Sequence, residues 1–113
     1  MHELSITQSI LSIALEKANE VQASKVTKIN LIIGELSGVV SKCVEFYFDL
    51  LSKDTIAAQA SLSFHQPPTQ LRCRGCAAVF SPNGLGWACP ICQEQKIEII
   101  SGRECHVDSM EVD

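Results

Sequence analysis

Residues 73–92 read CRGCAAVFSPNGLGWACPIC and contain two C-x-x-C pairs separated by twelve residues. Two residues between thiols form a tight turn that directs both sulfurs toward one point. Two such turns joined by a short hairpin supply the four soft ligands of a tetrahedral site with no open position. The spacing therefore predicts a structural Zn(II) site whose ligands are Cys73, Cys76, Cys89 and Cys92.

The residues inside the two turns suit this interpretation. Gly75 is predicted to supply a positive φ in the first turn, and Pro90 to preset the bend of the second. Reversible disulfides and an iron–sulfur cluster stay open as alternatives, since four thiolates do not by themselves separate iron from zinc. Zinc is favoured because two C-x-x-C pairs at this spacing are seldom redox-active.

Composition limits the remaining functions. The 113 residues are 46% apolar, which suits one compact core and a small accessory module. Nine basic and thirteen acidic side chains give a net charge of −4, which argues against binding to nucleic acid. The sequence has neither an apolar run long enough for a membrane helix nor a secretory signal, so we expect a cytoplasmic protein with reduced thiols.

Strand patterns flank the cysteine stretch on both sides. Ala60, Leu62 and Phe64 alternate with polar residues before Pro67, which predicts a strand. A last strand is predicted from Ile97 to the end, with a bulge where the alternation slips after position 102. Because the module interrupts two strands, it is predicted to be an insertion at the tip of an α+β domain.

The N-terminal part supplies the helices of that domain. Residues 4–22 form a predicted amphipathic helix with a wide apolar arc, capped by Ser5 and Gln8. Residues 26–36 form a predicted strand, and Ser41 is predicted to cap a second helix that ends near position 53. The buried face of this first strand is predicted to carry Thr27, Ile29, Leu31 and Ile33.

The predicted fold class is therefore α+β. Residues 1–69 and 96–113 are expected to form a small three-stranded sheet with two helices. Residues 70–95 are expected to form an inserted zinc-ribbon-like domain.

The first three residues, Met1, His2 and Glu3, are a candidate second metal site. A histidine at position 2 can chelate through its ring nitrogen together with the free α-amine and the backbone nitrogen of residue 2. The backbone nitrogen of Glu3 can complete the set. Such a flat nitrogen field suits Ni(II) and Cu(II). A solvated surface histidine is the alternative on these residues alone.

Four motifs and the paired C-x-x-C together resemble one family. The motifs are MHELS (1–5), GELSG (34–38), SGRE (101–104) and MEVD (110–113). They resemble the HypA/HybF family of hydrogenase-maturation nickel chaperones over the whole chain.

The resemblance implies a nickel-binding α+β domain with an inserted zinc domain, and no enzymatic activity. It also implies delivery of Ni(II) to the precursor of the large subunit of a nickel–iron hydrogenase, alongside the GTPase HypB. Carried over by position, the nickel site falls on His2 with the Met1 amine and the Glu3 backbone, and the zinc site on the four cysteines.

Two features depart from the family pattern. Cys43 stands where proline is expected, and no glycine follows Cys76 or Cys92, which makes the zinc turns less ideal without removing a ligand.

A zinc-ribbon module that binds nucleic acid or protein, and a thiol–disulfide switch, are the competing functions. A monomer or weak homodimer is expected.

Several residues have no assigned role. His65 is expected to be a surface imidazole, and Cys105 a small buried side chain facing away from its neighbour His106. Arg72 and Arg74 are expected to lie on a solvated surface beside the first zinc ligand.

Overall fold

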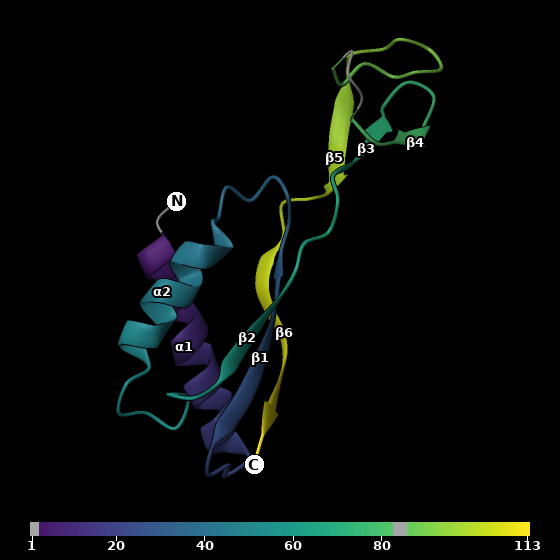
Figure 1. Cartoon of the computed structure of the whole chain (residues 1–113). Coiled ribbons are helices and arrows are strands. Elements are labelled where there is room, and N and C mark those ends of the chain that lie inside the picture. The colour runs from purple at the N-terminus through teal and green to yellow at the C-terminus, as the bar shows by residue number, and fades with distance from the viewer. Residues whose placement is uncertain (1–2, 83–85) are drawn as a thin grey trace.

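The computed structural model describes residues 3–82 and 86–113. It contains two three-stranded sheets, with strand orders β2-β1-β6 and β4-β3-β5 (Figure 1). The α+β class with two helices, a three-stranded sheet and a second small sheet is confirmed. The elements are α1 (Glu3–Glu20), β1 (Val26–Ile33), α2 (Ser41–Leu51), β2 (Ser61–His65), β3 (Gln70–Cys73), β4 (Val79–Phe80), β5 (Ile97–Ser101) and β6 (Cys105–Val112).

The main sheet is centred on β1, which pairs in parallel with β2 and antiparallel with β6. The parallel pair follows from α2, which carries the chain back between the two strands. A register shift between Val26 and Lys28 changes the side-chain alternation. Val26 is therefore buried where Thr27 was predicted, and the prediction for the first inward position is wrong.

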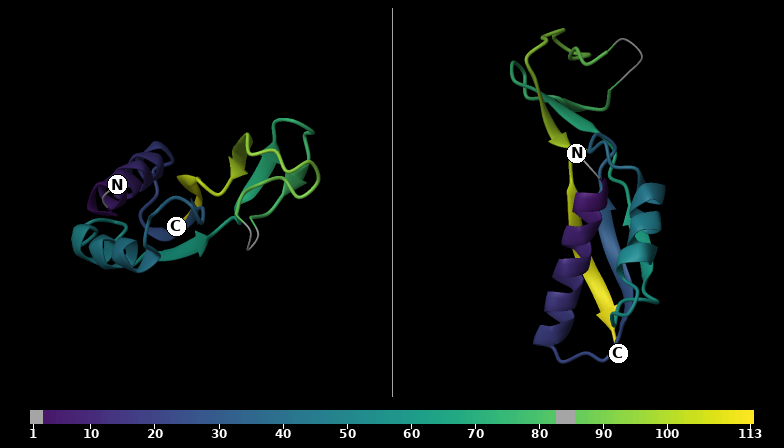
Figure 2. Two further views of the ribbon diagram at one scale, coloured as in Figure 1. Left: turned by 90° about the horizontal axis from the view of Figure 1, so that it is seen from above. Right: turned by 90° about the vertical axis from the view of Figure 1, so that its left-hand side faces the viewer.

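Both helices cover the same face of the main sheet (Figure 2). Ala14 and Ala18 of α1 have no exposed surface, and small side chains at these positions allow close packing. The wide apolar arc of α1 is explained, because this helix packs against both α2 and the sheet. The core consists mainly of Ile10, Leu11, Ala14, Ala18, Val26, Ile29, Leu31, Ile33, Val44, Phe48 and Ala57.

The two helices are tied together where they begin. Helix α1 begins at Glu3, so Ser5 lies inside it and the predicted capping box is wrong. Helix α2 is preceded by Val40 with no side-chain cap, so the predicted Ser41 cap is also wrong. The Val40 N–H instead donates to Glu3 Oε2 at 3.1 Å. The Glu3 carboxylate of α1 thus accepts a backbone N–H at the start of α2. An acidic residue in the first turn of a helix often accepts this hydrogen bond within its own helix.

The molecule is elongated, with extents of 55 × 25 × 17 Å. Its radius of gyration of 17.9 Å exceeds the value of about 13 Å expected for a compact domain of this length. The strand expected from Ile97 onward is two strands in different sheets, because β5 pairs with β3 and β6 pairs with β1. The chain changes sheets at Gly102, whose φ of 115° is in the left-handed region.

The two sheets meet at a junction formed by the segments that contain the GELSG and SGRE motifs. Gly34 N–H donates to the Glu104 carbonyl at 2.8 Å, and Leu36 N–H donates to the Gly102 carbonyl at 2.6 Å. A Cβ atom on Gly34 would overlap the Gly102 carbonyl group, which is backbone and cannot rotate away. The junction therefore needs glycine at position 34.

Two carboxylates complete this junction. Glu104 Oε1 accepts the Gly102 N–H at 2.7 Å, and Glu35 Oε2 accepts the Thr69 N–H at 2.6 Å. Hydrogen bonds from the backbone of Glu104 itself and of Gly102 lower the pKa of the Glu104 carboxyl. Both motifs therefore have a structural role in holding the second sheet against the first.

We expect Gly34→Ala to lower the free energy of unfolding by about 1–3 kcal/mol, because a methyl group has no room beside the Gly102 carbonyl. Urea titration followed by far-ultraviolet circular dichroism measures this change. Gly75→Ala is the matched control, since its Cβ would meet nothing closer than 3.5 Å and its φ is not left-handed. Equal stability of the two variants would contradict the junction described above.

Candidate metal centres

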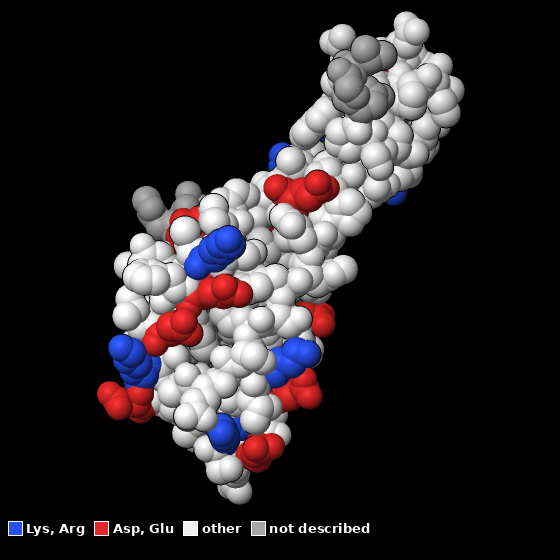
Figure 3. All heavy atoms as spheres, viewed as in Figure 1, with Lys and Arg blue, Asp and Glu red and all other residues white. Residues whose placement is uncertain are grey.

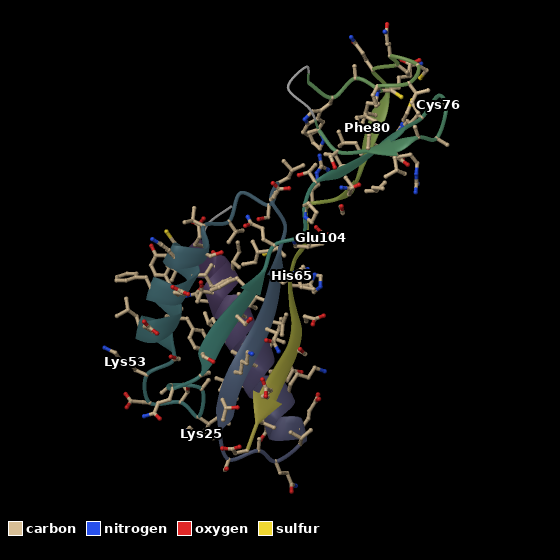
Figure 4. All side chains as sticks on the ribbon, turned by 45° about the vertical axis from the view of Figure 1, so that its right-hand side comes forward. Lys25, Lys53, His65, Cys76, Phe80 and Glu104 are labelled. Carbon is tan, nitrogen blue, oxygen red and sulfur yellow. The ribbon has the colours of Figure 1, made fainter. Side chains whose placement is uncertain are left out.

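The four predicted cysteines converge at the end of the second sheet (Figure 4, where Cys76 is labelled). Their sulfur atoms all lie within 4.8 Å of one another, with Cys73 Sγ 3.5 Å from Cys92 Sγ and Cys76 Sγ 3.6 Å from Cys89 Sγ. Four thiolates around Zn(II) at about 2.3 Å lie about 3.8 Å apart. The cluster therefore matches a tetrahedral S₄ site, and all six cysteines of the chain are free thiols.

Each C-x-x-C pair holds one buried and one exposed sulfur. Cys73 and Cys89 are buried, whereas Cys76 and Cys92 are exposed. The N–H of Gly75 donates to Cys73 Sγ at 3.3 Å, and the N–H of Ile91 donates to Cys89 Sγ at 3.4 Å. Both turns thus donate a backbone N–H to the buried sulfur, and Cys89 Sγ also accepts the N–H of Cys92 at 3.5 Å. These backbone dipoles favour thiolates.

The positive φ needed by each turn lies after the second cysteine. Ala77 has φ 64° and Gln93 has φ 62°, whereas Gly75 is not left-handed. The prediction that Gly75 supplies the positive φ is therefore wrong. The N–H groups of Ala77 and Gln93 close the turns by donating to the carbonyls of Cys73 and Cys89, both at 2.9 Å.

Hydrogen bonds and burial shift the pKa values of the cluster thiols in opposite directions. The backbone N–H of Cys92, together with that of Ile91, lowers the pKa of Cys89 to about 6 against the effect of burial. The backbone N–H of Glu94 lowers the pKa of Cys92, but its contact with the Cys73 thiol and burial outweigh this and raise the value to about 12. Without a cation, one thiolate disfavours the next, so a divalent metal is needed to ionise all four.

Only one residue of the N-terminal candidate site lies within the described part of the chain. Met1 and His2 lie outside it, and Glu3 is the first residue of α1. The Glu3 carboxylate accepts the Val40 N–H, and its carbonyl accepts the Thr7 hydroxyl at 2.6 Å. The start of α1 at Glu3 is therefore fixed against the start of α2.

The other candidate ligands do not form a cluster. His65 is exposed at the end of β2, as Figure 4 also shows, and His106 is exposed on β6. Both pair with Ile32, one on each side of β1. Cys105 is half-buried beside an apolar cavity of about 390 Å³ between α1 and β6. Among the described residues, only the four cysteines place three or more metal-ligating groups together.

Arg72 and Arg74 are engaged within the second sheet. Arg72 Nη1 lies 3.1 Å from Glu98 Oε1, and Arg74 Nε lies 3.8 Å from Glu98 Oε2. Arg72 is half-exposed, Arg74 is exposed, and both share the one carboxylate of Glu98, which offsets only one of their two positive charges.

The fold and the sulfur cluster together define a class of small α+β metal-binding proteins with a Cys₄ module set at one end of the main sheet. Residues 1–112 match the model of the hydrogenase/urease nickel-incorporation metallochaperones, HypA. The chain belongs to the HypA family. Members of this family are nickel metallochaperones of hydrogenase maturation and not enzymes, as the sequence predicted.

Relatives match along their full length. The chain is 45% identical to the hydrogenase maturation factor HypA of Dehalococcoides mccartyi, over 100% of this chain and 95% of that one. It is 40% identical to HypA of Caldanaerobacter subterraneus subsp. tengcongensis, over 100% of both. The solved structure of the Ni metallochaperone HypA from Helicobacter pylori matches with a TM-score of 0.70 at 27% identity, over 99% of this chain and 97% of that one.

A second solved HypA structure matches more closely in shape. Its TM-score is 0.79 at 28% identity, over 99% of this chain and 96% of that one. Within the described residues, neither helix combines the length and the apolar character that crossing a bilayer requires.

We expect Ala77→Gly to raise the free energy of unfolding of the zinc-loaded protein by about 0.5–1 kcal/mol, because glycine adopts φ 64° without the steric cost of a Cβ. Ala78→Gly is the matched control. Its backbone is not left-handed, so glycine there should lower stability by a similar amount. Urea unfolding followed by Trp87 fluorescence reports both, and the same sign for the two variants would contradict the prediction.

Proposed function

We propose that this chain binds Ni(II) at its N-terminus and delivers it to the precursor of the large subunit of a nickel–iron hydrogenase. The ligands are the Met1 α-amine, the ring and backbone nitrogens of His2, and the backbone nitrogen of Glu3. The observation that carries the proposal is the match to HypA over residues 1–112, which includes the histidine at position 2.

The chemistry of a chain end suits a carrier. Amine, imidazole and amide nitrogens form a flat ligand field that Ni(II) accepts and Zn(II) does not favour. A site at a chain end is open to ligand exchange, whereas four thiolates enclose their metal on all sides. Cu(II) would bind such nitrogens more tightly than Ni(II), so selectivity comes from metal availability and from the receiving protein.

The contact between the two helices supports the use of backbone nitrogen at position 3. The Glu3 carboxylate holds the Val40 N–H, so in this proposal Glu3 contributes its nitrogen and its side chain keeps the start of α1 in place. The carboxylate then has a positioning role.

In the second part of the proposal, Zn(II) is the metal of the sulfur cluster and is structural. The residues fit this ion because the sulfurs lie close to the spacing of a tetrahedral S₄ site and fill all four positions. A bound Zn(II) would hold the Cys73–Cys76 turn against the Cys89–Cys92 turn.

The partners and the domain division are also part of the proposal. The partners are the GTPase HypB and the hydrogenase precursor, with neither nucleic acid nor membrane, and the chain works in the cytoplasm as a monomer or weak homodimer. Residues 1–69 and 96–113 form the nickel-binding domain, and residues 70–95 the zinc-binding domain. The pairing of β5 with β3 extends the sheet of the cysteine module through Ser101, which lies past the proposed boundary at residue 95.

We expect untagged protein to bind one Ni(II) per chain in a diamagnetic square-planar site, and His2→Ala to lose this binding in calorimetric titration. An N-terminal extension should have the same effect, because it removes the α-amine. Nickel affinity should fall as the pH drops through the range of about 7.7–8.0 for the amine and about 6.5 for the imidazole, since both must lose a proton to bind.

His65→Ala and His106→Ala are the matched controls for this experiment. Both histidines are exposed on the main sheet and should leave nickel binding unchanged. Unchanged binding in His2→Ala and in the extended protein would exclude the N-terminal site, and so would a spectrum that places nickel among the thiolates.

We expect purified protein to contain one zinc per chain by elemental analysis, and Cys89→Ser to lose it. Cys43→Ser and Cys105→Ser should keep the metal, because these two thiols lie outside the sulfur cluster. A chelator should unfold the second sheet, since metal-binding free energy in such modules is folding free energy. Iron in place of zinc would contradict this assignment.

A further inference from the structure

The apolar cavity beside Cys105 is an open groove between α1 and β6. Ile10, Leu31 and Ile33 are buried at its base, whereas Ile13 at its rim is 41% exposed. Among the described residues, none from α2 or β2 lines this groove. Figure 2 shows the reason, since α1 lies on the β6 side of the helical layer and α2 on the β2 side.

The groove suits a few aliphatic side chains. Its volume of about 390 Å³ is near the lower end of the range of about 300–1,000 Å³ that is typical of ligand pockets. Within the described part of the chain, Ser9 and His106 are the only polar residues that line it. Burial raises the pKa of the Cys105 thiol, which keeps this side chain neutral and apolar.

The backbone of β6 beside the groove has a free hydrogen-bonding edge. Strand β6 is an outer strand, and within the described residues only β1 pairs with it. The Glu104 carbonyl accepts the Gly34 N–H, so the backbone of residue 104 faces β1. Alternate residues of an outer strand direct their backbone groups to opposite sides. Cys105 and Val107 therefore direct their N–H and C=O groups to the free edge.

The same two residues also line the groove with their side chains. Cys105 is opposite Ile33 and Val107 is opposite Leu31, on the face of the sheet that the helices cover. An extended segment paired with this edge would place every second side chain over the groove. This is the arrangement of strand addition, in which main-chain hydrogen bonds give affinity and apolar pockets select alternate side chains.

Charge separates the segments that could pair with β6. Residues 104–113 contain four acidic side chains and neither lysine nor arginine. Figure 3 shows red acidic side chains on the side of the molecule where β6 lies, with blue basic side chains near them. Lys28 lies 3.8 Å from Glu111, whereas no described residue forms an ion pair with Asp108. Two copies of β6 side by side would bring acidic strands together, which disfavours a homodimer through this edge.

We propose that the free edge of β6 and the adjoining groove bind an extended segment of another protein as an added strand. The segment pairs with the backbone of Cys105 and Val107, places aliphatic side chains in the groove, and carries a lysine or arginine near Asp108. The register of β6 shifts at Asp108, which confines the pairing to the residues before it. The interaction involves no metal, so it goes beyond the proposed nickel function.

A designed peptide tests the proposal. Its sequence is Lys-Val-Thr-Val-Lys-Val-Thr-Lys, with capped ends and a fluorescent label, and its binding to zinc-loaded full-length protein is measured by fluorescence anisotropy. Two further versions carry N-methyl groups, one on the valine amides and one on the amides of the residues between them. One version should lose at least about tenfold in affinity and the other should not, because only alternate amides face the paired strand. The version that loses affinity identifies the direction of the added strand.

Amide hydrogen exchange measured by nuclear magnetic resonance locates the contact. Addition of the peptide should slow the exchange of the Cys105 and Val107 amides, which face the free edge. The His106 amide should change little, because His106 pairs with Ile32 of β1 in the free protein. Slowing at alternate residues distinguishes strand addition from contact with the groove alone.

Variants of the chain separate the apolar and the charged parts of the interaction. Ile13→Ala should weaken peptide binding by about tenfold, because it removes part of the groove wall. Leu4→Ala is the matched control, since Leu4 is on the same helix and also 41% exposed, but lies outside the groove. Asp108→Lys should weaken binding by about threefold, as expected for one surface ion pair. Circular dichroism confirms that each variant is folded.

Four results would overturn the proposal. They are no binding of the unmethylated peptide at about 1 mM, equal affinity of the two methylated versions, equal effects of Ile13→Ala and Leu4→Ala, and sedimentation of the chain as a dimer that the peptide dissociates. The last result would assign the edge of β6 to a second copy. None of these measurements uses nickel, so they stand apart from the test of the N-terminal site.

Discussion

The close approach of two backbone segments at Gly34 and Gly102 is the constraint on which the shape of the molecule depends. Among the described residues, the hydrophobic core cluster belongs to the main sheet and the segments packed on it, and hydrogen bonds at the junction link this sheet to the segments that lead into the cysteine sheet. At that junction, glycine removes the side chain that would keep the segments apart, and the carboxylates of Glu35 and Glu104 satisfy backbone N–H groups that the change of sheet leaves without a strand partner. The elongated form follows, because the second sheet extends the first end to end.

The elements could be predicted because their signals are local. Alternation of apolar residues identifies β1 and β2, helical periodicity identifies α1 and α2, and two C-x-x-C pairs identify the metal module. The helix caps could not be predicted in the same way. Ser41 has the right residue type for a cap, but the contact that fixes the start of α2 comes from Glu3, which is 37 residues away from Val40. Sequence spacing gives no measure of such a long-range contact.

The same limit applies inside the metal module. The four ligands could be predicted from their spacing alone, whereas the backbone that presents them could not. Glycine adopts a positive φ at low cost, but Gly75 does not have to adopt one. The left-handed residue of this turn is Ala77 instead. The absence of glycine after each second cysteine was visible in the sequence, and the structure explains its consequence: Ala77 and Gln93 adopt a conformation that glycine would adopt at lower cost.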